Sequence, residues 1–144
     1  MPLNTSPIYS GQGDIQWPNI ILATANPAYD LSGSTATNTA TVVSASASGS
    51  FVQRIRFKAS GSTNATVARV FIGNANSPLT GSNVVLFDEI TLAGITAAPA
   101  AATATFELPM NIALPANYRV LVALGTTTTG GWHITAVGGS YVSS

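Results

Sequence analysis

Few side chains in this sequence could carry catalytic or metal chemistry. It has no Cys, a single His and five carboxylates in 144 residues. A zinc site needs a cluster of such ligands, so we expect neither a metal nor any other cofactor. His133 alternates with Trp132 and Ile134, which predicts a position on the outer face of a strand, and no Gly-x-Ser-x-Gly motif is present to support a catalytic triad. These observations favour a protein that is not an enzyme.

Asp88 and Glu89 are the only adjacent carboxylates. On a strand, neighbouring side chains point to opposite faces, so the two cannot act as a pair. Glu107 could meet one of them across a sheet and form the acid pair of a glycosidase. The simpler interpretation, which we favour, is that these acids pair with cations or line an interface.

Four of the five cations lie between Arg54 and Arg69. Residues 51–59 alternate with period two, which predicts a strand with a charged face and an apolar face. Residues 66–73 are expected to return as the hairpin partner of this strand, and they carry Arg69. The charged face either prevents edge pairing or contacts an acidic partner surface. Its cations are Arg54, Arg56 and Lys58, and the opposite face carries Phe51, Ile55 and Phe57.

The overall composition indicates a protein that packs against neighbours. Only 7% of the residues are charged and the net charge is zero, whereas 46% are hydrophobic; a typical soluble domain is about 25% charged. A neutral chain lacks the surplus of cations that phosphate binding needs, so no direct nucleic-acid partner is expected. No apolar stretch reaches the ~20 residues of a membrane span, and no basic, apolar signal segment opens the chain. We expect self-association as a dimer or trimer, with synthesis and assembly in the cytoplasm.

Residues 1–18 contain three prolines and two glycines and are expected to lack regular structure. They carry Ile8, Tyr9 and Trp17, large apolar groups that suit an interface. We expect an extended N-terminal arm that docks on a neighbouring subunit; the alternative is a tail with these side chains tucked under the core.

The rest of the chain, residues 19–144, is predicted to be one all-β domain. Short runs of β-type residues are separated by Gly, Pro and Asn turns, and no segment has a helical period. This spacing favours a single-domain, jelly-roll-like β-sandwich. The expected strands cover residues 19–25, 41–45, 51–59, 66–73, 84–92, 102–108, 111–114, 118–124 and 132–137, with 141–142 as an extension, and residues 93–101 form an Ala/Pro loop.

Two stretches of the sequence resemble small virion proteins of tailed bacteriophages. They are FVQRIRFK with TVARVFI at 51–58 and 66–72, and LPANYRVLV with the glycines of GGW and GGSY between 114 and 141. Within that group the sequence is most similar to capsid cement, or decoration, proteins. The resemblance implies a jelly-roll-like, homo-oligomeric subunit on the outside of a phage head, with the major capsid protein as its partner and no catalytic residues.

Our leading hypothesis is therefore a structural virion protein that reinforces the capsid surface. One alternative is a tail- or fibre-associated module that binds a host glycan through exposed Trp17 or Trp132; another is a minor capsid or tail-tube subunit. The candidate capsid or subunit contacts are Ile8, Tyr9, Trp17, Arg54, Arg56, Lys58 and Arg69.

Overall fold

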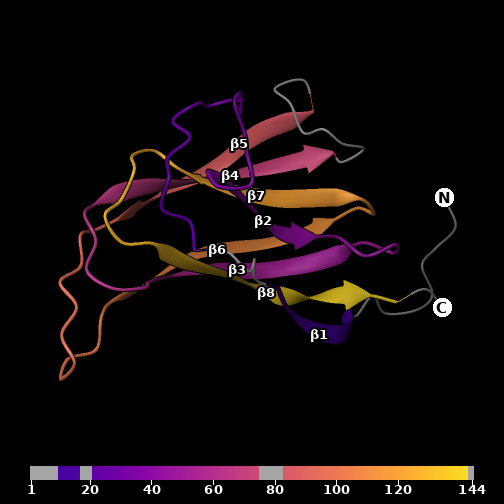
Figure 1. The fold of residues 1–144 in the computed structure, drawn as a ribbon. Helices are drawn as coiled ribbons and strands as arrows, with labels where there is room; N and C mark the ends of the chain where they lie inside the picture. The colour runs from indigo at the N-terminus through magenta and orange to yellow at the C-terminus, as the bar shows by residue number, and fades with distance from the viewer. Residues whose placement is uncertain (1–9, 17–20, 75–82, 143–144) are drawn as a thin grey trace, which may run out of the picture.

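Two antiparallel four-stranded sheets make up the structure, a computed structural model that describes residues 10–16, 21–74 and 83–142 (Figure 1). The all-β prediction is confirmed, and these ranges contain no helix. Sheet I has the order β1 (Ser10–Gln16), β8 (Trp132–Tyr141), β3 (Ser50–Ala59), β6 (Thr105–Leu114), and sheet II has the order β2 (Thr39–Ser44), β7 (Tyr118–Leu124), β4 (Thr66–Asn74), β5 (Val84–Leu92).

The strands pair in a nested manner. The first pairs with the last, β2 with β7, β3 with β6, and β4 with β5, so the chain resembles one long hairpin folded over on itself. Successive strands therefore change sheet everywhere except between β4 and β5. This pairing brings residues from the two ends of the chain to the same sheet.

A single large apolar cluster lies between the two sheets, which gives a β-sandwich-like arrangement. Alternate residues of each strand point into it, as expected for sheets with one buried face. Sheet I contributes Val52, Ile55, Phe57, Leu108, Trp132 and Ile134, and sheet II contributes Val42, Ala68, Val70, Val120 and Val122.

The alternation expected for β3 is interrupted at Gln53. The register of β3 against β8 shifts between Val52 and Arg54, so the strand carries one extra residue at this point, a β-bulge. Beyond an extra residue, each side chain of the strand points to the face opposite to the one that simple alternation predicts. Val52 is therefore buried, whereas Phe51 is only half-buried, and the prediction that Phe51 shares the core face of Ile55 was wrong.

The predicted hairpin between β3 and β4 was also wrong. β3 lies between β8 and β6 in sheet I, whereas β4 lies between β7 and β5 in sheet II. Residues 60–65 pass from one sheet to the other and bond to the segment before β8: Ser60 N–H donates to Gly131 O (2.9 Å) and Thr63 Oγ1 to Gly130 O (3.0 Å). These contacts hold the connection as a crossover rather than a tight turn.

The irregular N-terminal segment expected over residues 1–18 contains a strand. Ser10–Gln16 pairs with β8, with Ile15 opposite Val137, because that edge of β8 offers a ladder of hydrogen bonds that a polar, Gly-containing segment can fill. Sheet I thus begins ahead of the expected boundary at residue 18. The candidate contacts Ile8, Tyr9 and Trp17 lie outside the described residues.

Three other strand predictions need correction. Among residues 21–25 the structure has only a single bridge, between Leu22 and Trp132, in place of a strand. The two short strands expected at 102–108 and 111–114 form one strand, β6, because a register irregularity at positive-φ Asn111 (φ 49°) lets it continue past Pro109. The last strand extends from the expected 132–137 to Tyr141.

Candidate interaction surface

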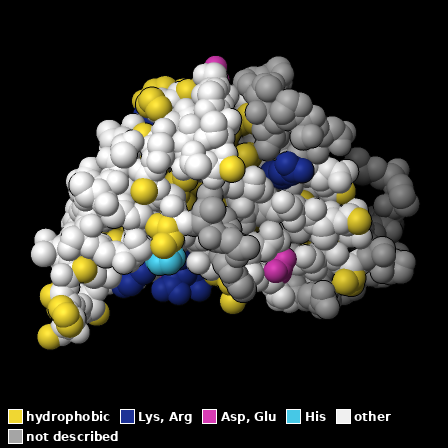
Figure 2. Space-filling model, viewed as in Figure 1, with side chains coloured by type: hydrophobic (Ala, Val, Ile, Leu, Met, Phe, Trp, Pro, Cys, Tyr) yellow, Lys and Arg dark blue, Asp and Glu magenta, His cyan; other side chains and the backbone are white. Residues whose placement is uncertain are grey.

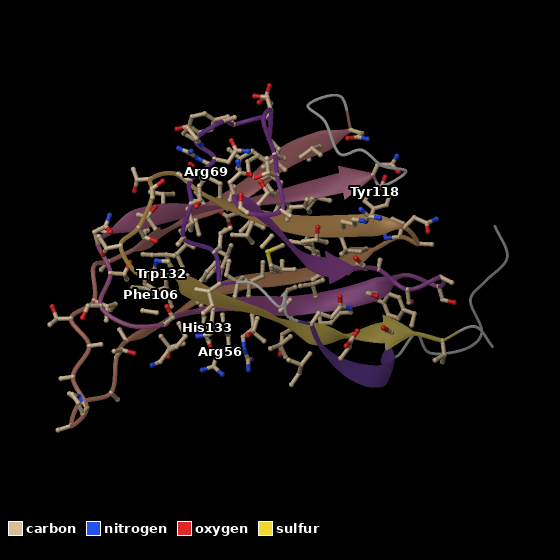
Figure 3. All side chains as sticks on the ribbon, viewed as in Figure 1. Arg56, Arg69, Phe106, Tyr118, Trp132 and His133 are labelled. Carbon is tan, nitrogen blue, oxygen red and sulfur yellow. The ribbon has the colours of Figure 1, made fainter. Side chains whose placement is uncertain are left out.

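The outer face of sheet I carries three of the predicted contact residues side by side. Ile55 and Phe57 point into the core, so Arg54, Arg56 and Lys58 point outward from β3. On the neighbouring strand β8, His133 lies opposite Lys58. We call Arg54, Arg56, Lys58 and His133 the basic face; Arg56 and His133 extend from the lower side of sheet I in Figure 3, and Lys, Arg and His atoms gather at the same edge in Figure 2.

One carboxylate lies among these cations. Glu107 on β6 is opposite Arg56, and its Oε1 is 2.9 Å from Arg56 Nε and 3.6 Å from Arg54 Nε. The expectation that the acids pair with the basic strand is confirmed for Glu107. The side chains of these ion pairs are 37–48% exposed, and exposed pairs contribute little to stability, so the arginines stay available to a partner.

Lys58 is held by uncharged groups. Its Nζ donates to Thr103 O and to Thr105 Oγ1 (3.3 Å). Among the described residues, Glu107 is the only carboxylate that forms an ion pair with this face, so the face has an excess of positive charge.

A hollow of about 380 Å³ lies beside these cations. Arg56, Lys58 and His133 line one part of it, and Ile15 of β1 with Val137 of β8 form an apolar part. Ile15 is 57% exposed. The hollow therefore offers positive charge next to an aliphatic surface, a combination that suits an acidic protein segment with apolar neighbours.

Arg69, the remaining predicted contact, lies on sheet II and away from this face (Figure 3). It is only 9% exposed. Its Nε donates to Glu89 Oε1 (2.8 Å), its Nη1 donates to Pro27 O (3.0 Å), and its guanidinium lies 4.0 Å from the centroid of the Tyr29 ring. Arg69 thus attaches the segment that follows residue 26 to the outer side of sheet II.

Replacement of Arg69 with Met should release this segment. We expect the free energy of unfolding to fall by about 1–3 kcal/mol, because three contacts of a nearly buried cation are lost together. Glu89→Gln is the matched control and should cost less than about 1 kcal/mol, since that carboxylate is 41% exposed. Urea unfolding and limited proteolysis between residues 26 and 38 measure both effects; equal losses in the two variants would contradict this role.

Trp132 cannot serve as a sugar-stacking platform. It is fully buried, and its ring meets Phe106 edge to face at 5.8 Å and 71°. The glycan-binding alternative was therefore wrong about Trp132, and its other residue, Trp17, lies outside the described residues. The glycosidase pair was wrong as well: Asp88 and Glu89 lie on β5 in sheet II, whereas Glu107 lies in sheet I.

In the described ranges no group of three or more His, Cys, Asp or Glu side chains could hold a metal ion. Within the same ranges no helix is long and apolar enough to cross a membrane.

The sequence did not predict the apolar part of the hollow. Ile15 belongs to a strand that the sequence did not predict, and it reaches the hollow only because β1 pairs with β8. Alternation in residues 132–137 places Val137 on the same face as His133, and this was the one feature of the sequence that could have predicted an apolar side chain beside the cations.

Fold and surface together define an all-β protein of two four-stranded antiparallel sheets with a basic outer face. Comparison with protein-family models, with curated proteins and with solved structures found no match.

Proposed function

We propose that this chain is a structural virion protein, a homo-oligomeric decoration subunit that binds the outside of a phage capsid and stabilises it. The nested strand pairing carries the proposal. Eight antiparallel strands in the orders β1-β8-β3-β6 and β2-β7-β4-β5 are what a rolled-up hairpin, a jelly roll, would have, and viral capsid domains use that architecture repeatedly. The proposal has no role for catalysis.

The basic face is the proposed contact with an acidic surface of the assembled capsid shell, on the major capsid protein or on a neighbouring copy of this chain. Its cations project from a strand fixed on both sides by β8 and β6, so they are presented on a rigid surface. Charged groups at the rim of an interface mainly steer association and set orientation. Ile8, Tyr9 and Trp17 remain proposed contacts of an N-terminal arm.

The connection between β5 and β6 supports an assembly role independently. It projects at the lower left of Figure 1, and residues 96–102, an uncharged run of Thr, Ala and Pro, are all exposed. Small side chains allow a partner backbone to approach closely and lose little conformational entropy when they are buried. Such a projection suits a lattice contact better than recognition of a small ligand.

Attachment to purified virions of the phage that encodes this chain tests the proposal. The wild-type protein should co-sediment with particles that lack it and raise the temperature at which they release DNA. Arg56→Ala with Lys58→Ala should weaken attachment by about tenfold, on the order of 1.4 kcal/mol, with an unchanged Tm. Arg119→Ala, a cation of β7 outside the basic face, is the control and should bind normally. Wild-type protein that stays in the supernatant would refute the proposal.

A further inference from the structure

A second surface, at the edge of sheet II, complements the basic face in charge. The chain is neutral overall, and the basic face holds an excess of cations, so carboxylates are in excess elsewhere. Asp88 on β5 is exposed, and its carboxylate accepts a hydrogen bond from Glu89 N–H rather than from a cation. The nearest neighbour of this acid, Glu89, pairs with Arg69.

The same edge exposes large apolar side chains. Val85 is 61% exposed and Phe87 is 43% exposed. Asp88 and Leu86 pair with the consecutive residues Val70 and Phe71, so Phe87 is the extra residue of a bulge. In the described part of the chain, β5 has β4 on one side and no strand on the other. We call Val85, Phe87 and Asp88 the β5 edge.

An uncovered edge of this kind is a site of association. Apolar side chains on a long edge strand favour pairing with another chain, and native proteins cover or block such edges. The β6 edge of sheet I has Pro109, which lacks an N–H group, and the charged Glu107. The β5 edge carries no proline in Val84–Leu92, but its bulge at Phe87 and its carboxylates oppose the addition of a further strand. It therefore suits a contact made through side chains rather than through a backbone ladder.

We infer that the β5 edge of one copy docks into the hollow of the basic face on the next copy. Asp88 would approach Arg56, Lys58 and His133, and Phe87 with Val85 would lie against Ile15 and Val137. The occupant is a second copy of this chain because each patch has what the other lacks, acid for base and apolar for apolar. The inference rests on the homo-oligomer of the proposed function and specifies its contact.

A symmetric contact between two β5 edges is less favourable. With full overlap of Val84–Leu92 in antiparallel register, Asp88 would lie opposite Asp88 of the second strand, and like charges directly opposite each other destabilise a pair. A contact between two different patches is heterologous, and it forms a ring if the rotation closes. A discrete homo-oligomer of this kind requires the closed ring.

Light scattering on a sizing column tests this contact by charge exchange. Wild-type protein should run as one oligomer, and Asp88→Lys and Arg56→Glu should each weaken self-association by at least about tenfold. The double variant should recover the wild-type mass, since the reversed charges attract again. His133→Glu serves as a second face variant, because Arg56→Glu places a new acid beside Glu107. Thermal melting confirms that each variant is folded.

Two matched controls exchange charge outside both patches. Asp30→Lys changes an exposed acid whose pKa is held below its usual value by the Ser32 backbone N–H, and Arg119→Glu changes a cation of β7. Both should keep the wild-type mass. Single variants that assemble normally, or a double variant that stays monomeric, would overturn the contact between copies but not the proposal of capsid attachment. A wild-type monomer would overturn the contact and the homo-oligomer, and co-sedimentation with virions decides separately whether the chain binds capsids.

Discussion

Gly138→Ala should destabilise the fold more than any other single-methyl change in sheet I. A Cβ built at Gly138 would lie 1.9 Å from Phe51 O and 3.0 Å from Phe51 C, both backbone atoms of the paired strand. Neither strand can yield easily, because β8 is bonded to β1 and β3, and β3 is bonded to β8 and β6. Glycine inside a strand often marks such a close backbone approach at a bulge. We expect a loss of about 3 kcal/mol or more in the free energy of unfolding, or failure to fold.

Gly13→Ala is the matched control for this substitution. Gly13 lies in β1 of the same sheet, and nothing lies within 4 Å of the position its Cβ would take. Alanine there should be neutral or stabilise the protein by a few tenths of a kcal/mol, since it restricts the unfolded chain. Urea unfolding of both variants measures the difference. Similar stabilities would show that the backbones of β3 and β8 can separate at the bulge without cost.

Trp132→Ala is the second substitution with a large expected effect. The side chain is fully buried, packs edge to face on Phe106, and its backbone forms a bridge with Leu22. Truncation of a buried Trp typically costs about 3–5 kcal/mol, because the apolar contacts are lost and a cavity remains. At about 4 °C per kcal/mol for a domain of this size, we expect the Tm to fall by more than 10 °C.

Trp132→Phe separates packing from hydrogen bonding at the same position. The indole Nε1 has no hydrogen-bond partner in the described structure, and an unsatisfied buried donor costs free energy. Phenylalanine removes that donor and keeps most of the apolar volume, so we expect less than half of the loss seen with alanine. A phenylalanine variant as unstable as the alanine variant would indicate that the N–H group has a partner.

The sequence predicted the strands that have clean alternation and missed the one that lacks it. Residues 51–59 alternate charged and apolar side chains, and this pattern identified β3 and its charged face. Ser10–Gln16 reads SGQGDIQ, with two glycines and one large apolar residue, so no local preference marks it as a strand. It is a strand because β8 offers an edge for it, and that is a tertiary effect that a local pattern does not contain.

Pairing was harder to predict than the strands themselves. Residues 66–73 follow β3 closely, so a hairpin was the natural expectation, but the partners of β3 come from residues 105–114 and 132–141. The candidate site shows the same limit. Its cations were found by alternation, whereas Glu107 and Ile15 reach it only through pairing with distant strands. Arg69 was grouped with the basic face for the same reason, since the expected hairpin would have placed it in that sheet.

The position of β8 has a consequence for how the protein is made. Strand β8 lies between β1 and β3, so sheet I lacks an interior strand until residues 132–141 have been synthesised. A nascent chain that ends before Trp132 presents β1 without a partner and β3 with only one neighbour. Contacts between distant residues also make folding slow. Commitment to the native structure is therefore expected only after β8 has been synthesised, and until then the unpaired strands of sheet I can associate with other chains.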